Sequence, residues 1–155
     1  MVWEELSAAR VVPSLEASTM EEVMEGLGTV MIDRGYAKDT YVDALVERER
    51  AFPTGLDING VGVAIPHTDV SHVIKEGMAI GKLNKPVRFT LMGTDDETTD
   101  VSLVFMLSVK DPQGHLVQLQ RILEIIQDNE VLKRLMSCDN AAAIIDVIKE
   151  KEQSL

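Results

Sequence analysis

The 155 residues predict a single-domain α/β sandwich in which helices flank a mixed β-sheet. Segments near both ends of the chain repeat apolar residues at a helical spacing. Segments in the middle either alternate apolar with small residues or are apolar throughout, as strands are. The expected order is two helices, three or four strands, and two or three helices, which differs from the strict alternation of a doubly wound fold.

Two helices are expected in the first third of the chain. Over residues 18–35, apolar residues recur every three or four positions and so share one helix face. Ser18, followed three residues later by Glu21, has the pattern of a capping box. The second helix is expected over residues 39–51, with Asp39 as its N-cap.

The middle of the chain has the features of strands. The segment that alternates Val and Ile with small residues follows the turn dipeptide Asn59-Gly60. The segment VSLVFMLSV is almost entirely apolar, which is typical of a central strand covered on both faces, and an acidic loop over residues 93–100 precedes it. The expected strands are residues 9–12, 61–65, 77–83, 87–89 and 101–109.

The last third of the chain predicts three helices, over about 115–127, 130–136 and 140–150. In the first of them the apolar residues share one face, which we expect to be buried. Those residues are Leu116, Leu119, Ile122, Leu123 and Ile126.

Length and composition limit what the protein does. We expect residues 1–155 to form one domain, with its core at about 9–150, because this length buries a sizeable core but leaves little room for a second one. The formal net charge of -11 is opposite to the basic footprint that nucleic acid or anionic membrane requires. Only 4% of the residues are aromatic, so no base-stacking platform is expected.

The sequence also predicts a cytoplasmic protein. The lone Cys138 excludes an internal disulfide, and its expected place is in the core as a small hydrophobe. No stretch reaches the roughly 18 apolar residues of a membrane span. The first six residues lack the basic and apolar regions of a signal peptide.

Several motifs for cofactor and metal binding are absent from the sequence. There is no glycine-rich phosphate loop, dinucleotide fingerprint, HExxH or paired CxxC motif. His67 and His72 are five residues apart, a spacing that aligns them neither on a helix face nor on one side of a strand. We therefore expect neither a cofactor nor a metal.

His67 is the strongest candidate for chemistry. Pro66 donates no backbone hydrogen bond and biases Ile65 toward an extended conformation, so the strand should end there and His67 should be the first residue past it. Such a position presents the imidazole on a rigid support at the rim of the sheet. The alternative from the local sequence is a turn histidine that happens to follow a proline.

Three phrases of the sequence resemble a known family. They are RERAFPTG at 48–55, GVGVAIPH at 60–67 and DPQGHLVQL at 111–119. Together they resemble enzyme IIA of the fructose/mannitol class of the bacterial phosphoenolpyruvate-dependent sugar phosphotransferase system, with the galactitol type as the nearest variant. The similarity covers essentially the whole chain and implies the EIIA fold.

The resemblance implies a set of site residues. His67 would receive a phosphoryl group on Nε2, His115 would be a second active-site histidine, and Arg48 would face the phosphoryl group. Two features depart from the family pattern. Thr68 stands where the family usually has Gly, and the loop at 57–60 is longer than in mannitol-type proteins.

Each partner residue also has a simpler interpretation. Arg48 could be a solvated arginine at a helix end, paired with a neighbouring glutamate, and Arg50 competes with it for the phosphate. His115 could merely cover the first turn of a helix. His72 fits no part of the family pattern, and we expect it to be a solvated residue near the site.

The resemblance also implies a place in a transfer chain. Phospho-HPr would be the donor and a cysteine of the cognate enzyme IIB the acceptor, with coupling to the membrane component IIC, for uptake of galactitol or a related sugar alcohol. Carboxylates around His67 would steer a basic face of HPr. The alternatives are a regulatory module of nitrogen type and an interaction domain of this fold without transfer activity.

Overall fold

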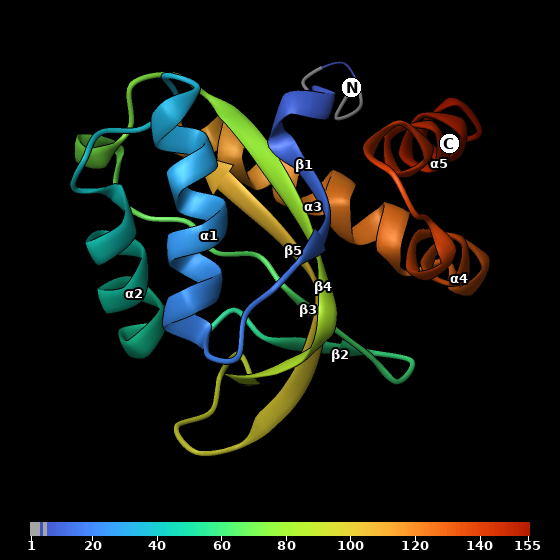
Figure 1. Cartoon of the computed structure of the whole chain (residues 1–155), viewed down its shortest axis with the longest axis horizontal. Coiled ribbons are helices and arrows are strands. Elements are labelled where there is room, and N and C mark those ends of the chain that lie inside the picture. Colours follow the sequence, from blue (N-terminus) through green and yellow to red (C-terminus); the bar gives the residue numbers. More distant parts are fainter. Residues whose placement is uncertain (1–3, 5) are drawn as a thin grey trace.

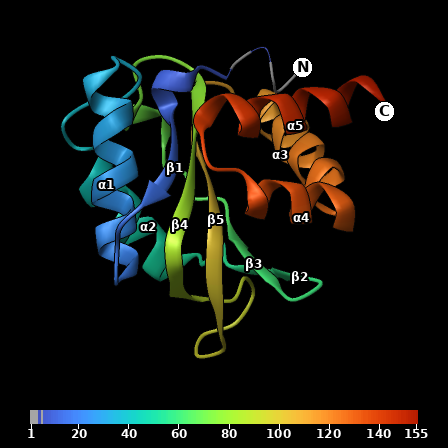
Figure 2. The same cartoon turned by 45° about the vertical axis from the view of Figure 1, so that its right-hand side comes forward.

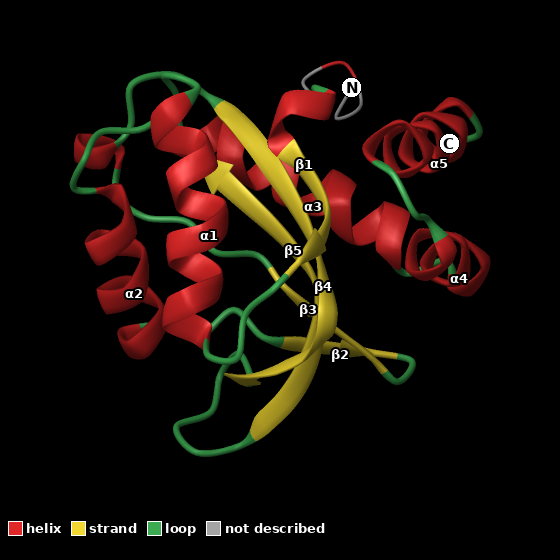
Figure 3. Cartoon of the chain, viewed as in Figure 1, coloured by secondary structure: helices red, strands yellow, loops and turns green. Residues whose placement is uncertain are grey.

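Five strands form one mixed sheet with helices on both faces (Figures 1 and 3). The computed structural model describes Glu4 and residues 6–155. A short 3₁₀ helix at Ala8–Arg10 leads into the first strand. The elements that follow are β1 (Val11–Leu15), α1 (Met20–Asp33), α2 (Tyr41–Ala51), β2 (Leu56–Ile58), β3 (Val61–Ala64), β4 (Gly77–Thr90), β5 (Thr98–Ser108), α3 (Pro112–Ile126), α4 (Asn129–Ser137) and α5 (Ala141–Gln153).

The sheet has the strand order β1-β4-β5-β3-β2, so β5 lies at its centre. Strands β4 and β5 pair antiparallel, β1 and β3 join them in parallel, and β2 pairs antiparallel with β3 at the edge. Helices α1 and α2 lie on one side of the sheet and α3, α4 and α5 on the other (Figure 2). The predicted α/β sandwich with a mixed sheet is confirmed.

Strand β5 separates two hydrophobic cores. Leu103, Phe105 and Leu107 face the core under α3, α4 and α5. Val104 and Met106 face the core under α1 and α2. This confirms that the apolar segment at 101–109 is a central strand covered on both faces, since every second side chain enters the opposite core.

Two strand predictions are corrected. Strand β2 was not among the expected strands, and it pairs with β3 across Asn59 and Gly60, both of which have positive φ angles (53° and 89°). Residues 77–83 and 87–89, expected as separate strands, belong to the single strand β4. Its pairing with β5 shifts register between Lys82 and Val87, and this irregular stretch accommodates Pro86, which has no N–H for the ladder.

Helix starts also differ from the expected positions. Thr19, not Ser18, is the N-cap of α1, and its hydroxyl accepts a hydrogen bond from Glu22 N. Thr40 occupies the N-cap position of α2 in place of Asp39 and makes no capping bond. Helix α3 begins at Pro112, three residues before the expected start, because Asp111 caps it.

None of the helices in the described part of the chain is long and apolar enough to cross a membrane.

A substitution at Gly62 tests how closely β3 and β5 approach each other. It lies at the shift in register between these strands, and a Cβ atom there would overlap the carbonyl oxygen of Asp100. Gly62→Ala should lower the free energy of unfolding by about 2 kcal/mol, because the two strands must move apart. Urea denaturation measures this change. An unchanged midpoint would mean that the strands do not approach as closely as described.

Candidate functional site

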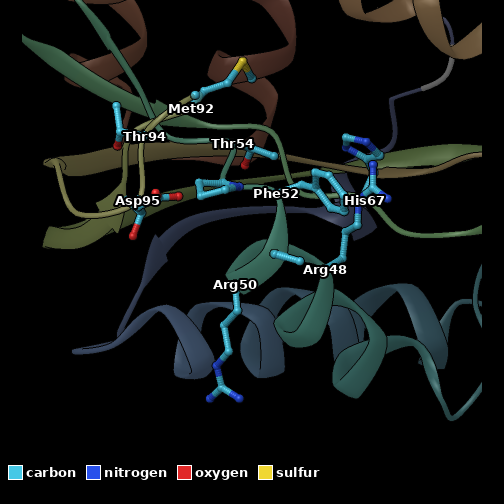
Figure 4. Close-up of a pocket in the computed structure, with 12 residues that line it drawn as sticks. Arg48, Arg50, Phe52, Thr54, His67, Met92, Thr94 and Asp95 are labelled. Carbon is cyan, nitrogen blue, oxygen red and sulfur yellow. The ribbon is translucent and has the colours of Figure 1, made fainter.

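His67 stands on a buried backbone support beside the centre of the sheet. Strand β3 ends at Ala64, so His67 lies three residues past the strand and not directly after it as expected. Ile65 and Pro66 are buried, and Leu107 N of β5 donates a hydrogen bond to Pro66 O (2.9 Å). The central strand thus holds the backbone that carries the histidine, and the half-buried side chain lies in the site (Figure 4).

One hydrogen bond defines the tautomer of His67. Its Nδ1 lies 3.1 Å from the carbonyl oxygen of Ile65. A carbonyl only accepts, so Nδ1 carries the proton and Nε2 keeps its lone pair. Burial lowers the pKa of His67, the bond to Ile65 opposes this effect, and the charge of Arg48 lowers the pKa further. The ring is therefore neutral near pH 7, with the lone pair of Nε2 free.

His115 packs against His67 from the first turn of α3. The ring centroids are 4.5 Å apart and the ring planes are inclined by 45°. Asp111 shapes this turn, because its side chain accepts from Gln113 N and its carbonyl accepts from His115 N. Burial lowers the pKa of His115, and the charges of His67 and Arg48 lower it further. Two neutral imidazoles thus share the site near pH 7.

Arg48 enters the same site from the last turn of α2. Its guanidinium carbon lies 4.2 Å from the centroid of the Phe52 ring, at the distance of a cation–π contact. Among the described residues no carboxylate pairs with Arg48. Within the described residues its charge is therefore not neutralised and is available to bind an anion.

The structure separates the two candidate arginines. Arg50 lies 3.2 Å from the carboxylate of Glu21 on α1 and is exposed. Figure 4 shows Arg48 directed toward His67 and Arg50 directed away from it. The two side chains diverge because they are two residues apart on a helix, which is about 200° of rotation.

A cavity of about 400 Å³ opens beside His67 (Figure 4). One wall is made by Arg48, Phe52 and Thr54, from the end of α2 and the loop that follows. The opposite wall is the turn after β4, at residues 92–95. His115 does not line this cavity, so the paired histidines mark its edge and not its centre.

Two buried nitrogens at the site lack a hydrogen-bond partner within the described chain. They are Nε of Arg48 and Nδ1 of His115. An unpaired buried polar atom carries a free-energy cost, and such atoms are often found where a protein binds a ligand. The guanidinium of Arg48 and the two imidazoles converge at the edge of the cavity. The arrangement suits a group such as phosphoryl.

The other candidates lie outside this group. Nδ1 of His72 lies 2.8 Å from the hydroxyl oxygen of Thr40. Cys138 is buried, as expected for a small hydrophobe, and burial raises the pKa of its thiol. Thr68 is also buried. In the part of the chain that the structure describes, no three His, Cys, Asp or Glu side chains cluster as metal ligands would.

Sequence reasoning missed Glu49 and Thr54 as members of the site's support. The carboxylate of Glu49 is buried and accepts hydrogen bonds from the backbone N–H and the hydroxyl of Thr54. The hydroxyl of Thr54 in turn accepts from Ile65 N. Both residues lie in the phrase RERAFPTG, but only the fold shows that this phrase contacts the support of His67.

Comparisons with known proteins show the family of the chain. Residues 5–151 match the sequence model of the family described as phosphoenolpyruvate-dependent sugar phosphotransferase system, EIIA 2. The galactitol-specific EIIA component of Escherichia coli K12 is 31% identical over 116 residues, covering 75% of this chain and 77% of that protein. A mannitol-specific enzyme IIA component of Halalkalibacterium halodurans is 30% identical over 148 residues, or 94% of each chain.

Other relatives differ in what their names describe. A nitrogen regulatory protein of Bradyrhizobium diazoefficiens is 27% identical over 141 residues, covering 89% of this chain and 88% of that protein. Among solved structures, mannitol enzyme IIA of Escherichia coli, in complex with phosphorylated enzyme IIB, has a TM-score of 0.78. It is 23% identical, and the match covers 94% of this chain and 97% of that chain, so this comparison establishes the fold.

The charge of Arg48 should have a measurable effect on the pKa values of both histidines. Arg48→Gln should raise the pKa values of His67 and His115, because the positive charge that disfavours their protonation is lost. Both pKa values should stay below the ordinary value of a histidine, since burial is the largest cause of the lowering. NMR titration of the imidazole protons checks this. Arg50→Gln, the matched control, should change neither pKa, and equal effects of the two variants would contradict the placement of Arg48.

Proposed function

The chain belongs to the EIIA 2 family of the phosphoenolpyruvate-dependent sugar phosphotransferase system, and we propose that His67 is the residue on which it carries a phosphoryl group. The observation that supports this most is the bond from His67 Nδ1 to Ile65 O, which leaves Nε2 free beside the unpaired charge of Arg48. Residues 9–150 would contain the core of this phosphocarrier domain.

The transfer needs little beyond a placed nucleophile and charge neutralisation. The lone pair of His67 Nε2 attacks the phosphorus on the donor side chain. The bond between that phosphorus and the donor atom breaks, and its electron pair stays with the donor. Nδ1 keeps its proton, so the phosphorylated ring is cationic, and Ile65 O stabilises that charge by accepting the hydrogen bond. In onward transfer an acceptor thiolate attacks the phosphorus, and the electron pair returns to Nε2.

Arg48 and His115 would stabilise the moving phosphoryl group. The guanidinium of Arg48 offers a charged fork to the equatorial oxygens, and its stacking on Phe52 holds it in place without a competing carboxylate. His115, neutral and adjacent to His67, would donate a ring N–H to another oxygen.

Protein partners fit the surface near His67 better than a small substrate does. Large apolar side chains are exposed here at Phe52, Leu116 and Val117, whose relative exposures are 60%, 59% and 68%. Helical periodicity predicted Leu116 to be buried, and instead it lies on the surface in the turn that carries His115. Exposed apolar groups around a reactive residue are typical of a surface that meets another protein.

We infer that phospho-HPr is the donor and the cognate enzyme IIB the acceptor. The mannitol enzyme IIA with this fold forms a complex with its phosphorylated enzyme IIB, which supports the second partner. The relatives named for galactitol and mannitol support a sugar alcohol as the solute that the whole system takes up. That solute would not bind this chain.

A regulatory role is the second candidate. It is favoured by the relative named as a nitrogen regulatory protein, which matches over 89% of this chain. In that case phosphorylation of His67 would change binding to another protein. Genes for IIB and IIC components beside this one would favour transport over regulation.

Intact mass spectrometry tests the proposed acceptor. With phosphoenolpyruvate, enzyme I and HPr, the protein should gain one acid-labile phosphoryl group, and His67→Ala should gain none, because the nucleophile is gone. His72→Ala, which removes a histidine outside the site, is the matched control and should be phosphorylated normally.

The same assay separates the acceptor from the residues around it. Arg48→Ala should slow transfer about 100-fold while the far-ultraviolet circular dichroism stays unchanged. His115→Ala should also slow it. An adduct that forms undiminished in His67→Ala would show that the acceptor is another residue.

The acidic surface predicts how the donor approaches. Exposed carboxylates near the site, at Asp69, Asp95 and Asp111, would attract a basic face of HPr and raise the encounter rate. The second-order rate of transfer from phospho-HPr should therefore fall as salt rises, since salt screens this attraction. Asp95→Asn should weaken the salt dependence, and Asp146→Asn, which lies on α5, should not. A rate independent of salt would rule out steering.

A further inference from the structure

The backbone that carries His67 is held from a second direction, by the loop that follows α2. Thr54 in this loop is 5% exposed, and its hydroxyl oxygen accepts a hydrogen bond from Ile65 N (3.1 Å). Ile65 uses its other backbone group for His67, because Ile65 O accepts from Nδ1 (3.1 Å). A single buried residue thus joins Thr54 to the imidazole.

Thr54 is itself fixed by a buried carboxylate. Glu49, which is 5% exposed, accepts from Thr54 N (2.8 Å) and from the Thr54 hydroxyl, at 2.9 Å to Oε1 and 3.0 Å to Oε2. Because the hydroxyl proton points to Glu49, a lone pair of the oxygen is left for Ile65 N–H. Burial raises the pKa of Glu49, and the hydrogen bonds from the Thr54 backbone and hydroxyl oppose this effect.

The loop has little freedom to move away from Ile65. Met92 N donates to Gly55 O (2.8 Å), which ties the loop to the end of β4. A Cβ atom at Gly55 would lie 2.5 Å from Thr90 O, so only glycine permits this close approach. Glu49 on one side and β4 on the other thus define where the Thr54 hydroxyl lies.

We propose that Thr54, oriented by Glu49, is a positioning residue that holds the Ile65 backbone so that the proton of His67 stays on Nδ1 and Nε2 stays free to react. This inference rests on the proposed function of His67. The effect is geometric, because the N–H and the C=O of Ile65 belong to adjoining peptide groups. Neither Thr54 nor Glu49 needs to touch the phosphoryl group.

The proposal is tested on the unphosphorylated protein by ¹⁵N NMR of the His67 ring, which reports the population of the two tautomers. In the wild type the Nδ1–H form should predominate. Thr54→Val keeps the side-chain shape but leaves Ile65 N–H without its acceptor, so the Nε2–H form should rise to a comparable population. Thr54→Ser, which restores the hydroxyl, should return the wild-type spectrum.

A matched control separates positioning from stability. The hydroxyl of Ser108, on β5, is also buried and donates to the carbonyls of Lys75 and Gly77. Ser108→Ala should lower stability without changing the tautomers of His67. If Thr54→Val lowers stability similarly and leaves the tautomers unchanged, Thr54 is only structural and the proposal is wrong.

Glu49→Gln keeps the test decisive should Thr54→Val fail to fold. The amide N–H₂ of the glutamine can donate to the Thr54 hydroxyl and so compete with Ile65 N–H, which should shift the tautomers in the same direction. A wild-type tautomer ratio in Glu49→Gln would overturn the proposal.

Kinetics give an independent readout. Thr54→Val should reduce kcat for transfer from phospho-HPr about tenfold, the scale at which residues behind a reacting group act, with KM unchanged. A rise in KM alone would overturn the proposal. Absence of transfer in the wild type would instead refute the function of His67, and the tautomer result would stand independently of it.

Discussion

The hydrogen bond between His67 Nδ1 and Ile65 O is the interaction on which the site depends. It determines which ring nitrogen keeps its lone pair, and it requires the backbone at residues 65–67 to be rigid. The fold supplies that rigidity from the centre of the sheet. Leu107 N on β5 holds Pro66 O, and the hydroxyl of Tyr41 at the start of α2 holds Leu107 O (2.7 Å). The end of α2 acts on Ile65 through Thr54, so one helix supports the histidine at both of its ends.

The electrostatics of the site are dominated by the positive charge of Arg48 beside two neutral imidazoles. Arg48 and two neutral imidazoles converge, and no described carboxylate pairs with Arg48. Burial and the charge of Arg48 keep both imidazoles neutral near pH 7. A doubly charged phosphoryl group would balance the charge of Arg48 and of the modified ring. The site would therefore be better matched to a phosphorylated His67 than to the free ring.

Much of the fold could be predicted because local patterns and tertiary packing agree. The apolar run at 101–109 reads as a central strand because both of its faces are covered, and α1 and α5 follow their periodicity. The hairpin strand β2 was missed because its three residues are too few to show alternation. Pro86 suggested a break in β4, but pairing with β5 resumes beyond it. Leu116 broke its helical pattern because it lies beside His115 on the surface.

The site was predictable where it depends on motifs and unpredictable where it depends on folding. Pro66 and the three family phrases pointed to His67, His115 and Arg48, which the structure brings together. No pattern shows that Thr54 reaches Ile65, eleven positions away.

The central claim is that the phosphoryl group sits on Nε2 of His67, and NMR of the ¹⁵N-labelled, phosphorylated protein tests it most directly. Coupling between ³¹P and His67 Nε2, with a proton on Nδ1, is the predicted result, and phosphorus on Nδ1 or on His115 would contradict it.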